Sequence, residues 1–172
     1  MKLGKVDTNN QVYIVAEIGS NHCGSLALAK EHIRAAASCG VDCIKFQYFK
    51  ADKVYPPTGS ASYLKTDKSL NSILRDFEIT NISWLGILSN ECSKYGVDFA
   101  CTPFDLGGVD DLNPFVSWWK IASFELTWHE LIKKCVATGK PVVMSTGGAS
   151  ELDIVEAVKA ASTTTTKPGY KY

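Results

Sequence analysis

Short apolar runs and amphipathic stretches alternate along this chain. The apolar runs predict β-strands at residues 12–18, 41–46, 97–101, 118–122 and 141–144. In the stretches between them apolar residues recur every three or four positions, which predicts helices at 25–39, 81–95, 106–113 and in two later segments. Alternating strands and helices indicate an α/β fold with a parallel sheet.

The predicted helices have recognisable ends and apolar faces. Thr127 and Glu130 have the spacing of a capping box, which predicts a helix start there, and Gly139 closes that helix. Ser150 is the expected cap of the last helix. The residues expected on the buried faces of the first and last helices are Leu26, Ala29, Ile33, Ala36, Leu152, Val155 and Val158.

Two closures are open for such a sheet, a doubly wound sheet and a barrel. No glycine-rich dinucleotide fingerprint follows the first strand, which weakens the case for the doubly wound sheet. A complete (β/α)8 barrel needs about 250 residues, whereas this chain of 172 residues supplies about five of the eight units. We therefore predict an incomplete TIM-type barrel over residues 1–161 and an unstructured tail over 162–172. The long polar connection 49–79, with a short helix near 70–77, is of a length that is usually functional.

Polar side chains stand at the C-terminal end of every predicted strand. In a barrel these ends meet at one mouth, where barrel enzymes carry their active sites. Taken in chain order, the residues are Glu17, Asn21, His22, Lys45, Gln47, Thr102, Asp105, Lys120, Ser123, Glu125, Ser145 and Thr146.

Lys45 and Lys120 matter most because they interrupt apolar strands. A buried lysine is costly unless an anion pairs with it. Thr102, Ser123 and Ser145 add hydroxyl donors for phosphate or carboxylate oxygens. Two cations and three hydroxyls predict a site for a small, highly anionic ligand, and the glutamate that ends the first strand is the natural acid, base or cation partner.

These residues also have structural interpretations. Lys45 and Lys120 can pair with Glu17 and Glu125 in a network that only stabilises the fold. His22 is equally well explained as a loop or cap residue.

The remaining conspicuous residues are expected to be structural. Trp118 and Trp119 are better explained by packing than by sugar binding. The sequence STGG at 145–148 also suits a strand-to-helix turn. The cysteines lack paired metal spacing and are expected to be small buried hydrophobes; they are Cys23, Cys39, Cys43, Cys92, Cys101 and Cys135.

The composition is that of a soluble globular protein, with 45% hydrophobic and 21% charged residues. A formal net charge of zero gives no electrostatic case for binding nucleic acid or an anionic membrane. No apolar run reaches the length of a membrane span, and the first residues lack the apolar core of a signal peptide. The cytoplasm is the expected location.

Five ordered motifs then carry a resemblance to a known family. They are AEIGSNHCGS at 16–25, IKFQ at 44–47, CTPFD at 101–105, KIAS at 120–123 and GKPVVMSTG at 139–147. From about residue 3 to residue 161 the chain resembles the N-terminal barrel portion of the N-acetylneuraminate (sialic acid) synthases of the NeuB type.

The resemblance implies a fold and a reaction. Such synthases have a (β/α)8 barrel followed by a small antifreeze-like domain. They condense phosphoenolpyruvate with an N-acetylated amino sugar of the N-acetylmannosamine type and release phosphate, giving a nine-carbon 2-keto sugar acid. By resemblance, Glu17 handles protons on the attacking water, and Gln47 and Glu125 contact the sugar. Phosphoenolpyruvate is expected at Lys45, Thr102, Lys120, Ser123 and Ser145.

The resemblance also implies a cofactor and partners. A divalent metal, manganese or magnesium, is held in the family by two histidines on later strands, so its ligands are not expected in this chain. We expect the chain to need a C-terminal half or to form a homo-oligomer, and to lack turnover alone. The alternatives are a pseudaminic or legionaminic acid synthase of the same family and a non-catalytic anion-binding remnant.

Overall fold

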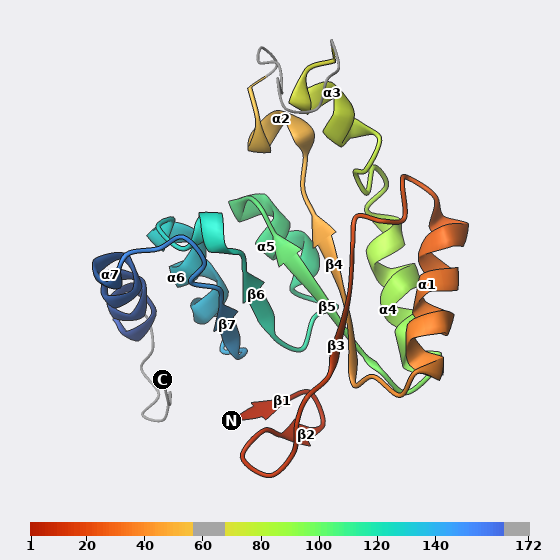
Figure 1. The fold of residues 1–172 in the computed structure, drawn as a ribbon, viewed down its shortest axis with the longest axis horizontal. Coiled ribbons are helices and arrows are strands. Elements are labelled where there is room, and N and C mark those ends of the chain that lie inside the picture. The colour runs from red at the N-terminus through yellow and green to blue at the C-terminus, as the bar shows by residue number, and fades with distance from the viewer. Residues whose placement is uncertain (57–67, 164–172) are drawn as a thin grey trace.

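The computed structural model describes residues 1–56 and 68–163 and shows a small N-terminal hairpin followed by five strand–helix units (Figure 1). The hairpin pairs β1 (Lys2–Leu3) with β2 (Val6–Asp7). The main sheet contains β3 (Val15–Gly19), β4 (Cys43–Tyr48), β5 (Asp98–Pro103), β6 (Trp119–Ile121) and β7 (Val142–Met144). The helices are α1 (Leu26–Ser38), α2 (Ala51–Val54), α3 (Leu70–Arg75), α4 (Ser83–Lys94), α5 (Leu106–Leu112), α6 (His129–Ala137) and α7 (Glu151–Ser162), and a 3₁₀ turn, η2 (Ser123–Glu125), follows β6.

The strand order decides between the two predicted closures. All five strands are parallel and lie in the order β3-β4-β5-β6-β7. A doubly wound sheet reverses its strand order at a switch point, and the strands of this sheet follow one another without reversal. The sheet is therefore a section of barrel wall, and the predicted α/β fold of incomplete TIM-barrel type is confirmed.

The outer face of the sheet forms the main core with the helices. Phe46, Cys101 and Trp119 are aligned across β4, β5 and β6 and are fully buried. Ile33 of α1 and Leu88 of α4 belong to the same cluster. Aromatic side chains contribute the largest apolar areas to such a core, so these central strands are the best anchored part of the sheet.

The inner face of the sheet has an apolar layer near the N-terminal ends of the strands. Trp118 Nε1 donates to the hydroxyl of Tyr13 at 3.2 Å, and that hydroxyl donates to Asp98 at 2.7 Å. The N-terminal hairpin lies at this end of the sheet (Figure 1) and contributes one residue to the layer. The buried members are Leu3, Cys43, Ala100 and Trp118.

Strand boundaries differ from the predicted ones for a tertiary reason. The predicted first strand includes Val12 and Ile14, but these side chains are 83% and 52% exposed. The partner strand β4 begins opposite Val15, so the earlier residues have no strand to pair with. At the other end, β4 and β5 extend past the predicted ends at residues 46 and 101, because Gln47 pairs with Thr102 and Tyr48 pairs with Pro103.

One of the two predicted helix starts is wrong. Thr127 and Glu130 form no capping box, since the N-cap of α6 is Trp128 and no side chain caps it. The chain is still in the turn that follows η2 when it passes Thr127. The cap at Ser150 is confirmed: its hydroxyl accepts from the Asp153 N–H at 3.2 Å, and the Asp153 carboxylate accepts from the Ser150 N–H at 2.9 Å.

The predicted buried face of the last helix is wrong for Leu152 and Val155, whereas Val158 is partly buried. Leu152 and Val155 are exposed, whereas Ile154 and Ala157 pack into the core. Helix α7 packs mainly on α6 among the described elements. The small side chains of Ala157 and its neighbours allow close approach of the two helices, which turns the larger residues outward. The predicted face of α1 is confirmed by the full burial of Ala29 and Ile33.

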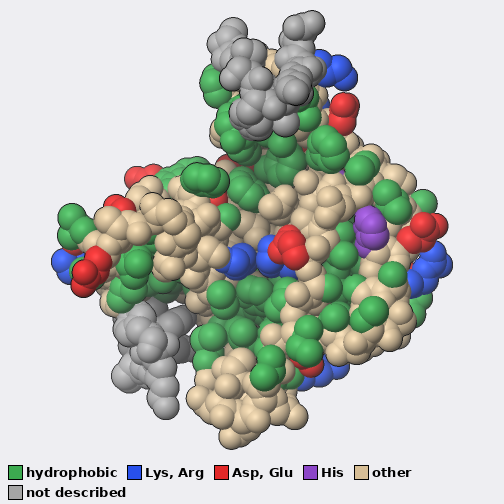
Figure 2. Space-filling view, viewed as in Figure 1, with side chains coloured by type: hydrophobic (Ala, Val, Ile, Leu, Met, Phe, Trp, Pro, Cys, Tyr) green, Lys and Arg blue, Asp and Glu red, His purple; other side chains and the backbone are tan. Residues whose placement is uncertain are grey.

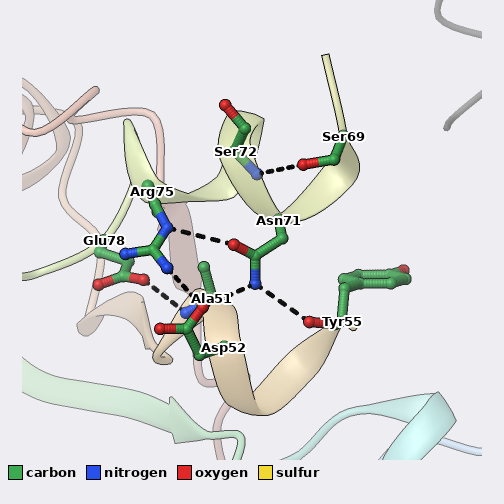
Figure 3. A network of polar contacts seen from close by, with 8 residues as sticks. All are labelled: Ala51, Asp52, Tyr55, Ser69, Asn71, Ser72, Arg75 and Glu78. Atoms are coloured by element: carbon green, nitrogen blue, oxygen red, sulfur yellow. Dashed lines mark hydrogen bonds and ion pairs between the residues drawn. The ribbon is translucent and has the colours of Figure 1, made fainter. Parts of the chain in front are cut away.

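The long connection after β4 carries α2 and α3, which are joined by polar contacts (Figure 3). Arg75 forms an ion pair with Asp52 at 2.6 Å, and the Asn71 amide donates to the same carboxylate at 3.0 Å. The Glu78 carboxylate accepts from the N–H of Ala51. These contacts hold α2 and α3 beyond the C-terminal end of the sheet (Figure 1). The middle of the predicted connection, 57–67, and most of the predicted tail lie outside the described residues.

Candidate functional site

The strand register places the predicted site residues on one face of the sheet. In parallel strands paired residues point to the same side, and alternate residues along a strand share that side. Glu17 pairs with Lys45, and Gln47 pairs with Thr102. Lys120 follows Trp118 of the inner apolar layer by two positions. These residues therefore point to the inner face, and they lie nearer the C-terminal ends of the strands than the apolar layer does.

Lys45 is paired with Glu17 across β3 and β4. The two side chains form an ion pair. Lys45 is only 8% exposed, whereas the Glu17 side chain is 49% exposed. A buried ammonium needs an anion, and the half-exposed carboxylate supplies one while remaining accessible to solvent. Of the two ion pairs in the structural interpretation, the pair of Lys45 with Glu17 is thus present.

Lys120 lies close to the same pair. Its ammonium donates to the Ser145 hydroxyl and, at 3.0 Å, to the Ile121 carbonyl oxygen. Burial lowers the pKa of Lys120, the Lys45 charge lowers it further, and Glu17 opposes the shift. Lys45 pairs with Ala100 of β5, and Ala100 belongs to the same inner layer as Trp118, two positions before Lys120. Lys45 and Lys120 therefore lie on the same inner face, and basic and acidic side chains meet in the middle of the face shown in Figure 2.

A bulge at the end of β3 positions Glu17 and Gln47. The sequence did not predict this bulge, which depends on Gly19. The register of β3 against β4 shifts between Glu17 and Gly19. Gly19 has φ of +59°, and a Cβ there would lie 3.2 Å from Glu17 Oε1 and 3.6 Å from Gln47 Oε1. A bulge with a left-handed glycine re-aims neighbouring side chains. Gly19, two positions after Glu17, was the feature of the sequence that could have predicted the bulge.

The η2 turn brings two more predicted residues to this end of the sheet. Ser123 lies against the loop after β7, because a Cβ on Gly147 would be 3.6 Å from the Ser123 Cβ. The Glu125 Oε2 atom is buried and has no hydrogen-bond partner among the described residues. Burial raises the pKa of this carboxyl group. Glu125 does not pair with Lys120, so the second ion pair of the structural interpretation is not formed.

The polar residues at the end of β5 divide into two roles. Thr102 is buried on the inner face beside Gln47. Asp105 instead caps α5 by accepting from the Gly108 N–H at 3.0 Å, and it pairs with Lys53 of α2 at 3.0 Å. The ion pair and these hydrogen bonds hold the pKa of Asp105 below its usual range, although burial acts against them. Asp105 is therefore a positioning residue for α2 and α5.

His22 lies behind the site. It is fully buried, its Nδ1 accepts from the Gly24 N–H at 3.2 Å, and its ring meets Trp84 edge-on at 5.9 Å. Its Nε2 has no hydrogen-bond partner within the described residues. The interpretation as a loop residue that fixes the turn after β3 agrees with these contacts.

His22 should make folding stability depend on pH. Burial lowers its pKa, and the nearby His32 lowers it further, so the folded state keeps it neutral. The unfolded chain takes up a proton near pH 6.5, and stability should therefore fall as the pH drops below about 6.5. His22→Asn keeps an acceptor for Gly24 and should flatten this slope in urea melts between pH 5 and 8. His129→Asn is the control and should keep the slope; an unchanged slope in His22→Asn would contradict the assignment.

The predicted burial is confirmed for both tryptophans and for four of the six cysteines, and it is wrong for Cys23 and Cys39. Trp118 and Trp119 are 2% and 0% exposed and belong to the two apolar clusters. Four of the six cysteines are buried, and only Cys23 and Cys39 are exposed. Burial raises the pKa of the Cys43 thiol to about 12, which keeps it protonated and unreactive.

No group of three or more histidine, cysteine, aspartate or glutamate side chains within residues 1–56 and 68–163 is placed to hold a metal ion. These residues do not by themselves fit the divalent metal that the family resemblance implies. In the same described ranges, no helix combines the length and apolarity needed to cross a membrane.

The fold and the site together define a class of protein. A parallel sheet with sequential strand order carries a cluster of charged and hydroxyl side chains at the C-terminal ends of its strands, which is the arrangement of barrel enzymes. A model of the NeuB family matches residues 32–168. The chain belongs to the NeuB family.

Two relatives of similar sequence are longer than this chain. The chain is 37% identical over 155 residues to protein MJ1065 of Methanocaldococcus jannaschii and 37% identical over 151 residues to an N,N'-diacetyllegionaminic acid synthase of Campylobacter jejuni. The matches cover 90% and 84% of this chain but 43% and 45% of those proteins. The chain thus spans less than half the length of these relatives.

A solved structure agrees with the sequence comparison. The N-acetylneuraminic acid (sialic acid) synthetase of Leptospira borgpetersenii serovar Hardjo-bovis, crystallised with citrate, superposes with a TM-score of 0.82 at 28% identity. The match covers 95% of this chain and 55% of that chain. The five strand–helix units therefore correspond to about half of a relative's polypeptide.

Proposed function

We propose that this chain supplies the phosphoenolpyruvate site of a synthase that condenses phosphoenolpyruvate with an N-acetylated amino sugar. One observation supports this most: Lys45, which is buried, and Lys120, which is half-buried, both lie on the inner face of the sheet. Lys45 pairs with Glu17, and Lys120 donates to the Ser145 hydroxyl and the Ile121 carbonyl. A trianionic ligand would neutralise both ammoniums. Three hydroxyls, those of Thr102, Ser123 and Ser145, belong to the same end of the sheet.

The proposed binding roles follow from position. Lys45 and Lys120 bind the phosphate and carboxylate of phosphoenolpyruvate, and the ammonium of Lys120 is already oriented by Ser145. Ligand binding at Lys45 releases the Glu17 carboxylate from its ion pair. Glu17 is half-exposed, so it can then turn toward a water molecule. Gln47 lies beside Glu17 and contacts the acceptor sugar.

The proposed reaction consumes one water molecule and forms one carbon–carbon bond. The C3 carbon of phosphoenolpyruvate attacks the aldehyde carbon of the open-chain sugar, and the aldehyde oxygen takes a proton. C2 then carries cationic character, and water adds to it while Glu17 accepts a proton. The bond between C2 and the phosphate oxygen breaks, which gives the 2-keto acid and inorganic phosphate. Most of the catalytic effect in such a site comes from fixing the anion beside the aldehyde.

The identity of the acceptor sugar is a separate part of the proposal. The proposed acceptor is of the N-acetylmannosamine type, and the alternative is a diacetamido sugar, as the name of the Campylobacter relative indicates. Competition between the two sugars in an assay of phosphate release distinguishes these acceptors.

Turnover at this site should require further polypeptide beside β7. An apolar groove of about 360 Å³ lies between β7 and α7 and is lined by residues including Val142, Met144, Ile154 and Val158. Strand β7 is also the last strand of the described sheet. A further strand–helix unit, from a C-terminal half or from a second copy, would cover the groove and add residues to the mouth.

The test measures binding and turnover separately. Calorimetry should detect phosphoenolpyruvate binding to this chain, whereas phosphate release with manganese, phosphoenolpyruvate and N-acetylmannosamine should be absent until a C-terminal half from a relative is added. Failure to bind phosphoenolpyruvate would overturn the proposed function. Robust turnover by the chain alone would overturn the requirement for further polypeptide.

A non-catalytic anion-binding remnant is the second candidate. The Lys45–Glu17 ion pair favours it, because the pair satisfies the buried ammonium without any ligand. Phosphoenolpyruvate binding that never leads to turnover, even with the added half, would support this candidate over the synthase.

A further inference from the structure

Two neighbouring strands of the proposed site stop pairing at one point. Gln47 of β4 pairs with Thr102 of β5, and the next pair, Tyr48 with Pro103, is the last one. Proline has no backbone N–H, so Pro103 cannot donate a hydrogen bond to extend the ladder. Beyond this point the ends of β4 and β5 are joined by side chains, directly after two residues of the proposed site.

Two side-chain contacts tie the end of β4 to the chain that leaves β5. The Tyr48 hydroxyl donates to the Asp111 carboxylate of α5 at 2.8 Å, and the rings of Phe49 and Phe104 meet edge-on with their centres 5.9 Å apart. Tyr48 and Phe49 are both buried. Burial raises the pKa of Tyr48 and the Asp111 carboxylate raises it further, so the hydroxyl stays protonated and continues to donate.

A third contact reaches β5 from α2. The Lys53 ammonium pairs with Asp105 at 3.0 Å, and Asp105 also caps α5, so the ion pair joins α2 to the first turn of α5. Gly107 leaves room for the pair, because a Cβ there would lie 3.0 Å from Asp105 Oδ1 and 3.7 Å from Lys53 Nζ. The ion pair of Asp52 with Arg75 joins α2 to α3 (Figure 3). The strand-end brace is the set of three contacts Tyr48–Asp111, Phe49–Phe104 and Lys53–Asp105.

The strand-end brace connects two parts of the proposed site. Thr102 is a proposed contact of phosphoenolpyruvate, and Gln47 is the proposed contact of the acceptor sugar. We propose that the brace carries the effect of phosphoenolpyruvate binding from β5 to α2. A ligand at Thr102 restrains the end of β5, and Lys53 passes this restraint to α2 and so to the strand end that carries Gln47. Lys53 acts through Asp105 and is therefore a positioning residue. This assignment rests on the proposed function, because both ligands come from it.

Hydrogen exchange of this chain with and without saturating phosphoenolpyruvate tests the coupling. In the unchanged protein the ligand should slow amide exchange at residues 50–55 about fivefold, at the low end of usual couplings between sites. Lys53→Met keeps the apolar stem of the side chain and removes the ion pair. The slowing at 50–55 should then fall below about twofold, and the slowing at 102–106 should persist. Phosphoenolpyruvate affinity should stay within about threefold, because Lys53 is half-exposed and its ion pair is weak.

A second variant separates positioning from stabilisation. Lys53→Arg keeps the charge and can still pair with the Asp105 carboxylate, so it should restore the slowing at 50–55. An ion pair that only stabilises α2 would instead change exchange at 50–55 by the same factor with and without ligand. In that case the ratio between the two states would be the same in Lys53→Met as in the unchanged protein.

Lys134→Met is the matched control. Lys134 also ties a helix to α5 through an ion pair, with Asp110 at 2.6 Å, but it reaches α5 from α6. This variant should keep the fivefold slowing at 50–55. Phosphoenolpyruvate binding without slowing at 50–55, equal slowing in Lys53→Met, or loss of the slowing in Lys134→Met would overturn the coupling and leave the proposed function standing. No phosphoenolpyruvate binding by the unchanged protein would overturn the proposed function and the coupling with it.

Discussion

Lys120→Met should weaken phosphoenolpyruvate binding about a hundredfold, because it removes one of two cations from a partly desolvated anion site. The variant keeps the length and apolar stem of the side chain. It also leaves the Ser145 hydroxyl without its present donor. Calorimetric titration of phosphoenolpyruvate into both proteins measures the effect.

The same substitution should not reduce folding stability. Burial lowers the pKa of Lys120, which means that the fold disfavours its charged form. Replacing a disfavoured charge with an apolar group is neutral or stabilising. Urea melts should therefore show an equal or higher midpoint. Weaker ligand binding together with unchanged or higher stability is expected when a residue serves ligand binding and does not stabilise the fold.

Lys94→Met is the control for the loss of one positive charge. Lys94 is exposed and paired with Glu91 at 2.7 Å on α4, at the other end of the sheet from the site. Its loss should leave phosphoenolpyruvate binding within about twofold, because exposed charges far from a site are screened by salt. Comparable losses in the two variants would indicate a general charge effect and would contradict the proposed site.

Trp119→Ala should lower the free energy of unfolding by about 3–5 kcal/mol, the usual cost of truncating a fully buried tryptophan. Trp119 is 0% exposed at the centre of the main core, and its Nε1 donates to the Thr138 hydroxyl at 2.7 Å. The Lys140 ammonium lies 5.9 Å from the centre of its ring. Chemical denaturation followed by circular dichroism measures the loss.

Thr138→Val separates the hydrogen bond from the packing. It removes the acceptor for Trp119 Nε1 and keeps the volume of the side chain, so it should cost about 1–2 kcal/mol. Trp119 also precedes Lys120 on β6, and the alanine variant should weaken phosphoenolpyruvate binding as well. A Trp119→Ala protein as stable as the unchanged one would contradict the assignment of the main core.

The order of elements was predictable because local pattern determines it. Five apolar runs and the helices between them were found at the right places, and the predicted cap at Ser150 follows local hydrogen bonding. The failed predictions are those that depend on partners. Val12 is apolar but has no strand opposite it, and Leu152 is displaced outward by the close packing of α6 and α7.

The candidate site was predictable as a set of residues but not as an arrangement. The sequence marks Lys45 and Lys120 as lysines in apolar strands. It does not show that Lys45 is held by Glu17 while Lys120 is held by Ser145. The sequence also did not show that Asp105 caps α5. An aspartate between a strand and a helix can be either a helix cap or a site residue.

The sequence by itself determined the element types, the βα alternation and the family, because each depends on residues that are near one another along the chain. Only the tertiary structure decided that the sheet has sequential strand order, that Lys45 and Lys120 share its inner face, and that Glu125 Oε2 is buried without a partner among the described residues. The physical reason is that charge repulsion, burial and unpaired hydrogen-bonding atoms depend on distances in space, and strand register and packing fix these distances.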